Sequence, residues 1–166
     1  MSFHTKIING LALCLALSIP AFAEVKAGQS FPDLAGFKLE GTVPDYHGQV
    51  VLVDFWATWC NPCKESFPAY SQLQRELAPR GFVLLAVSVD KSAALYADFL
   101  KQYQPAFPTV RDGTQKLAAQ VRPPSMPTSY LIDRKGVVHA VHNGFHGEAT
   151  VKELRAEIIR LLEEKS

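Results

Sequence analysis

Two near-continuous apolar runs, over residues 50–55 and 82–89, dominate the hydrophobic pattern of the chain. Such runs are typical of strands buried on both faces of a sheet. Apolar residues at helical spacing predict a helix over 93–103, with Leu95, Phe99 and Leu100 on one side. The same reading predicts further helices over 61–78, 114–121 and 151–162, and shorter strands over 107–110, 129–132 and 137–141.

The order of these elements predicts an α/β fold. Strand and helix alternate from residue 50 to 121, which is the pattern of parallel strands covered by helices. Strands 129–132 and 137–141 flank a turn at Asp133-Arg134-Lys135-Gly136 and should add an antiparallel pair. Residues 37–39 and 42–43 flank Glu40-Gly41 and predict an N-terminal β-hairpin. With 166 residues, we expect one domain built on a central mixed sheet flanked by helices.

The first 23 residues have the pattern of a secretory signal peptide. Lys6 precedes an apolar run over 7–19, Pro20 ends it, and Ala21-Phe22-Ala23 offers small residues for cleavage. We therefore expect a mature domain over 24–166 in the periplasm, and Cys14 removed with the signal. A retained membrane anchor is the alternative, although a spanning helix needs about 20 apolar residues.

Charge adds little beyond this picture. The chain has 17 basic and 16 acidic residues, and loss of Lys6 leaves 16 against 16. A neutral balance without a basic run argues against a nucleic-acid partner, and we expect a monomer. The mature part keeps two cysteines, Cys60 and Cys63, which can form a disulfide in an oxidising compartment.

The position of the two cysteines suggests reactivity. Cys60 falls where a strand ends and a helix begins, and the free N–H groups and dipole of a helix N-terminus favour a thiolate. Cys60, at the exposed start of this helix, should therefore be more reactive than Cys63. Three residues of helix rise about 4.5 Å. Disulfides need Cα atoms about 4.4–6.8 Å apart, so the spacing permits one without backbone movement.

Other roles for the pair fit less well. A structural zinc site takes four ligands, and the chain has no second cysteine pair. His139, His142 and His146 form the only histidine cluster, and positions 139 and 142 of a strand face opposite sides. A passive disulfide would close a very small loop, where stabilisation is least. We therefore expect no metal. The alternatives to a redox role are a copper- or zinc-binding chaperone and a thiol peroxidase.

The segment VDFWATWCNPCK resembles the active site of the thioredoxin superfamily. The leader AGQSFPDLAGFKLEGTVPDYHGQVVLVDFWATWC, the extra unit over 92–107 and SMPTSYLIDRKG resemble its exported TlpA/ResA-like branch, over nearly all of 27–165. The resemblance implies a thioredoxin-like fold with an inserted βα unit. It implies a thiol–disulfide oxidoreductase whose only redox group is the Cys60–Cys63 pair, without another cofactor. It also implies protein dithiols and disulfides as partners, a reducing role, a membrane electron donor and cytochrome c maturation.

The same resemblance assigns roles to individual residues. Cys60 matches the attacking thiol and Cys63 the resolving thiol, while Pro68 matches the proline that kinks the active-site helix. Pro127 matches the cis-proline that faces the disulfide. Four residues would border an apolar groove for the partner polypeptide: Trp59, Pro62, Met126 and Gly144.

Two positions depart from the branch. Relatives often carry a glutamate three residues after the second cysteine, where this chain has Ser66, and Glu65 is turned by about 100° around the helix. Conversely, Asp54 stands where the branch often has asparagine. Its strand is otherwise apolar, so desolvation should raise its pKa and suit it to exchange a proton with Cys63. The alternative is a purely structural aspartate.

Overall fold

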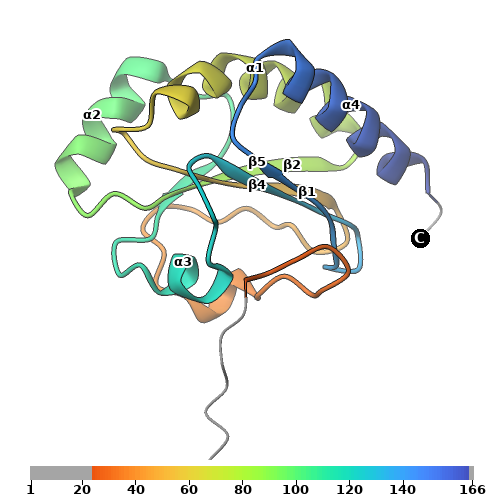
Figure 1. Ribbon diagram of the computed structural model, residues 1–166, viewed down its shortest axis with the longest axis horizontal. Helices are drawn as coiled ribbons and strands as arrows, with labels where there is room; N and C mark the ends of the chain where they lie inside the picture. Colours follow the sequence, from red (N-terminus) through yellow and green to blue (C-terminus); the bar gives the residue numbers. More distant parts are fainter. Residues whose placement is uncertain (1–23, 165–166) are drawn as a thin grey trace, which may run out of the picture.

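The computed structural model describes residues 24–164, so the predicted signal peptide lies outside the described residues. A five-stranded sheet with the order β3-β2-β1-β4-β5 forms the centre of the domain (Figure 1). Its strands are β1 Val50–Trp56, β2 Phe82–Ser88, β3 Thr109–Arg111, β4 Thr128–Ile132 and β5 Val138–Asn143. The helices are α1 Asn61–Leu77, α2 Ala93–Tyr103, α3 Lys116–Val121 and α4 Glu148–Glu163, with short 3-10 turns at Leu34–Gly36 and Ala78–Arg80.

The sheet is mixed, as the sequence predicts. β1 runs parallel to β2, and β2 runs parallel to β3. β4 is antiparallel to both β1 and β5. Every residue of β1 and β2 is buried, which confirms the reading of the two apolar runs as central strands. The predicted helices form with boundaries shifted by a few residues, and α1 continues through Pro68.

Helices cover both faces of the sheet. In Figure 1, α1, α2 and α4 lie over one face, while α3 and the N-terminal segment lie over the other. Alternate residues of β1 divide between the two cores: Leu52 and Trp56 pack under α1, and Val53 and Phe55 pack on the opposite face. Because strand side chains alternate, Asp54 shares the α1 face with Leu52 and Trp56.

The predicted N-terminal hairpin is wrong. Glu40 instead pairs with Arg111 of the edge strand β3 through two backbone hydrogen bonds of 2.9 and 2.8 Å. An edge strand of three residues leaves unpaired backbone groups, and the N-terminal segment covers them. Gly41 permits this approach, since its φ is +120° and a Cβ there would lie 2.9 Å from the Thr109 carbonyl oxygen.

The apolar side of α2 is only partly buried. Phe99 is buried and Leu100 packs against the same core, but Leu95 is 58% exposed. Leu95 lies in the first turn of α2, which begins at Ala93.

In the described part of the chain, no helix combines the length and apolar character needed to span a membrane.

Candidate active site

The two cysteines form a disulfide at the N-terminus of α1. Their Cα atoms are 5.3 Å apart, within the range that disulfide geometry requires. Cys60 is the N-cap of the helix, and its Sγ accepts a hydrogen bond of 3.2 Å from the Cys63 backbone N–H. The pair is almost enclosed, since Cys60 is 4% exposed and Cys63 is fully buried. In this oxidised state Cys60 is thus less exposed than the sequence analysis expects, although it is the outer sulfur of the two.

Asp54 is a fully buried carboxylic acid on the central strand. Its Oδ1 accepts a hydrogen bond of 2.6 Å from the Ser129 hydroxyl, and its Oδ2 has no hydrogen-bond partner among the described residues. Burial raises the pKa of Asp54 from its usual 3.8 to about 7, while the Ser129 hydrogen bond opposes that rise. A group that titrates near neutrality can both accept and donate a proton in the working range.

The hydrogen-bond partners of Asp54 were not predicted from the sequence. The Tyr70 hydroxyl lies 3.1 Å from Ser129 Oγ, so Tyr70, Ser129 and Asp54 form a buried polar chain from α1 to β1. Burial, and next the charge of Asp54, raise the pKa of Tyr70, which keeps its hydroxyl protonated. Tyr70 stands seven residues after Cys63, two turns further along the same face of α1. A tyrosine and a serine in apolar elements carry no local signal of this contact.

The predicted groove residues separate into two groups. Trp59 is 68% exposed and lines a groove that also includes Met126. The Met126–Pro127 peptide bond is cis, as predicted. The Gly144 N–H donates to the Pro127 carbonyl at 2.8 Å, so these two meet. Gly144 and the exposed Pro62 do not line the groove that holds Trp59 and Met126.

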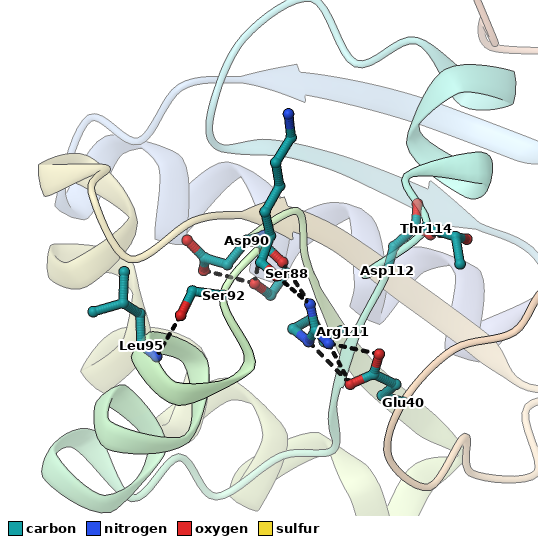
Figure 2. Close-up of polar contacts among 9 residues, drawn as sticks. Glu40, Ser88, Asp90, Ser92, Leu95, Arg111, Asp112 and Thr114 are labelled. Carbon is teal, nitrogen blue, oxygen red and sulfur yellow. Dashed lines mark hydrogen bonds and ion pairs between the residues drawn. The ribbon is translucent and has the colours of Figure 1, made fainter.

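Asp90 is a second functional candidate that the sequence analysis missed. It follows β2, is 4% exposed, and accepts hydrogen bonds from the Thr58 N–H at 3.0 Å and the Thr58 hydroxyl at 2.8 Å. The Ser88 hydroxyl donates to the same carboxylate at 2.7 Å (Figure 2). Thr58 lies two residues before Cys60, so Asp90 fixes the loop that presents the disulfide. An aspartate at the end of a strand was the only sequence signal of this role.

Comparison with known proteins agrees with this geometry. The AhpC/TSA family model matches residues 27–141. The chain belongs to the AhpC/TSA family. It is similar to the thioredoxin-like protein YneN of Bacillus subtilis, at 35% identity over 72% of this chain and 73% of that protein. It is also similar to the thiol-disulfide oxidoreductase ResA of Bacillus subtilis, at 30% identity over 85% of this chain and 84% of ResA.

Comparison with a solved structure supports the same relationship. A Chlorobium tepidum protein assigned as thiol:disulfide interchange protein DsbE superposes with a TM-score of 0.77 at 35% identity, over 84% of this chain and 99% of that one. The predicted resemblance and the thioredoxin-like fold are confirmed. With its Cys60–Cys63 pair, the chain is a thiol–disulfide oxidoreductase of the ResA and DsbE type.

Ser66 occupies the position at which relatives often carry a glutamate. Ser66 is buried, and its hydroxyl donates to the Cys63 carbonyl at 2.8 Å. Glu65, turned by about 100° around the helix from Ser66, is exposed. Among the described residues, no three His, Cys, Asp or Glu side chains are grouped to hold a metal ion. His142 instead lies 2.7 Å from the Glu157 carboxylate on α4.

Proposed function

We propose that this protein reduces disulfides of partner proteins after export, with Cys60 as the attacking thiol. The Cys60 thiolate attacks one sulfur of the partner disulfide, which forms a mixed disulfide and releases a partner thiolate that takes up a proton. Cys63 then attacks the Cys60 sulfur and releases the second partner thiol. Two electrons pass to the partner, and the Cys60–Cys63 disulfide remains.

The observation that carries this proposal is the position of the pair at the helix N-terminus. Cys60 Sγ accepts the Cys63 N–H in the structure, and the same N–H is available to a Cys60 thiolate. A hydrogen bond to the charged form, together with the helix dipole, favours the thiolate. Cys63 is the more deeply buried sulfur, which suits an internal second attack.

Within this proposal, Asp54 takes the proton that Cys63 must lose before its attack. Asp54 on β1 and Cys63 on α1 are both fully buried, on the side of the sheet that α1 covers. A carboxylate whose pKa is raised by burial is a stronger base than a surface carboxylate. The buried Ser129 hydroxyl stabilises the ionised form in the structure and can accept from the protonated form.

Trapping of the mixed disulfide tests the order of the two attacks. The Cys63→Ser variant should accumulate covalent complexes with partner proteins, because the first attack proceeds and the second does not. The matched Cys60→Ser variant should accumulate none under the same conditions. Non-reducing electrophoresis followed by mass spectrometry measures both. Equal trapping by the two variants would show that the assignment of Cys60 as attacking thiol is wrong.

Export and the pathway form the second part of the proposal. The Lys6-to-Ala23 pattern supports a signal peptide cleaved after Ala23. The TlpA/ResA-like resemblance supports a membrane electron donor and a role in cytochrome c maturation. Protein recovered from its native compartment, with the membrane fraction included, should therefore begin at Glu24, which intact-mass measurement checks. A mass that retains residues 1–23 would support the membrane anchor instead.

A further inference from the structure

A groove of about 830 Å³ lies beside the loop that carries the disulfide. Trp59, the residue before Cys60, and Met126, the residue before Pro127, both line it. The start of α2 and one side of α3 form the other walls, through residues that include Leu95 and Ala118. The walls therefore come from segments far apart in sequence that converge beside the redox centre.

Exposed apolar side chains are concentrated in this groove. Trp59 and Leu95, at 68% and 58% exposure, are the two large hydrophobic residues of residues 24–164 that are most open to solvent, and both line it. Met126 adds a partly buried thioether, and such flexible side chains adapt to different contacts. Apolar surface gathered in one concave place, rather than scattered singly, is characteristic of an interaction site.

The wall at the start of α2 is held by polar contacts, most of them made by the buried Arg111. Figure 2 shows Arg111 between the turn after β2 and Glu40 of the N-terminal segment. Arg111 Nη1 donates to the backbone carbonyls of Asp90 and Lys91 at 3.1 and 2.9 Å, while Nη2 pairs with the Glu40 carboxylate at 2.6 Å. Ser92 then caps α2 through the Leu95 N–H at 3.3 Å. The backbone that carries Lys91 and Leu95 is therefore fixed before a partner binds.

The charge at the groove is positive. Its walls include the exposed Lys91, and also Arg122, which already has an interaction within the protein. The one acidic residue among them, Asp90, is 4% exposed and its carboxylate is engaged by Thr58 and Ser88. The N-terminal end of α2 adds positive potential, because its first turn contains no acidic residue.

We propose that this groove binds an extended, acidic and apolar segment next to the disulfide of the partner protein. An apolar side chain of the segment packs against Trp59 and Leu95, and a carboxylate lies near Lys91. The inference rests on the proposed function, since the groove directs which disulfide meets Cys60. It assigns selectivity to residues that take no part in sulfur exchange.

Two synthetic peptides test the proposal directly. They are identical except for glutamate or lysine beside a single cysteine, which is capped as a disulfide with mercaptoethanol. The reduced protein should release the acidic peptide about tenfold faster than the basic one at low ionic strength, and added salt should shrink the difference. Lys91→Glu should remove or reverse this preference. Leu95→Ser should slow both peptides about equally.

Two controls separate the groove from the underlying chemistry. Lys101→Glu changes an exposed lysine of α2 that is outside the groove, and should keep the preference of the wild type. Hydroxyethyl disulfide is small and uncharged, and the Lys91, Leu95 and Lys101 variants should all reduce it at the wild-type rate. Two results would overturn the groove proposal while hydroxyethyl disulfide is still reduced at the normal rate. One is a wild-type protein without a preference for the acidic peptide, and the other is a Lys91→Glu variant that keeps this preference. If hydroxyethyl disulfide is not reduced by the wild type, the proposed function itself fails.

Discussion

The Asp54→Asn variant should be more stable than the wild-type protein by about 4 kcal/mol at about pH 8. Burial raises the pKa of Asp54 from 3.8 to about 7, and each pKa unit corresponds to about 1.4 kcal/mol between the two protonation states. Above pH 7 the wild-type protein must keep an ionised carboxylate in its core, while the unfolded chain ionises it freely. Asparagine has the same shape, can still accept from Ser129, and carries no charge.

The sign of the pH dependence follows from the raised pKa. Between about pH 4 and pH 7 the folded protein binds more protons at Asp54 than the unfolded chain does, so its stability should fall as pH rises through this range. The Asn variant should lack this slope, and its advantage should shrink to less than about 1 kcal/mol at pH 4. Urea unfolding of both oxidised proteins across this range measures the difference. Asp98→Asn, at an exposed position of α2, is the matched control and should change stability by less than about 0.5 kcal/mol.

The same variant should slow the second attack near neutral pH. Without Asp54, Cys63 loses the base that accepts its proton, although Cys60 should react with a disulfide at the wild-type rate. The slowing should diminish as pH approaches the thiol pKa, where Cys63 ionises unaided. Stopped-flow measurement of partner release resolves the two steps. Superimposable pH profiles for wild type and Asp54→Asn would remove Asp54 from the mechanism but leave its effect on stability.

Asp90→Ala should destabilise the fold by about 3 kcal/mol and also slow disulfide exchange. The change leaves the Thr58 N–H, the Thr58 hydroxyl and the Ser88 hydroxyl without their acceptor, and hydrogen bonds to a charged group contribute about 1.5–3 kcal/mol each. The loop that carries Cys60 then loses its fixed position. Because small displacements of a reacting group can cost up to about 100-fold in rate, we expect at least a tenfold slower reduction of hydroxyethyl disulfide.

A matched control separates the loop from general stability. Asp112 is a fully buried carboxylate after β3 that accepts hydrogen bonds from Ala118 N–H and the Thr114 hydroxyl, at 2.9 and 3.3 Å. Asp112→Ala should lose similar stability while it reduces hydroxyethyl disulfide at the wild-type rate. Denaturant unfolding and the exchange rate are measured for both variants at a temperature where both are folded. Equal rates for Asp90→Ala and wild type would contradict the positioning role.

Features that depend on local pattern could be predicted from the sequence. The buried runs of β1 and β2, the helix that begins after Cys60, and the disulfide spacing all follow from periodicity and helix geometry. Asp54 was found because a single acid interrupts an apolar strand. In each case the informative residues are close in sequence, so their spacing alone defines the structure.

Features that depend on distant pairing could not be predicted in this way. Residues 37–43 have the composition of a hairpin, but the backbone of Glu40 pairs with β3, about 70 residues later. Ser129 and Tyr70 approach Asp54 only because β4 and α1 pack on the same part of β1. Leu95 fits an apolar helix face, and its exposure depends on where α2 begins relative to the sheet.

The residues that form the groove walls differ from the residues that exchange electrons, so the two sets can evolve separately. Lys91 and Leu95 are exposed, so their replacement costs little folding free energy. Neither residue takes part in the proposed sulfur exchange, so both cysteines can stay unchanged while the walls vary. A duplicated copy can therefore acquire a new client protein through a few surface substitutions. Its electron chemistry would be inherited intact, and divergence in this lineage should be sought in the walls of the groove rather than at the cysteines.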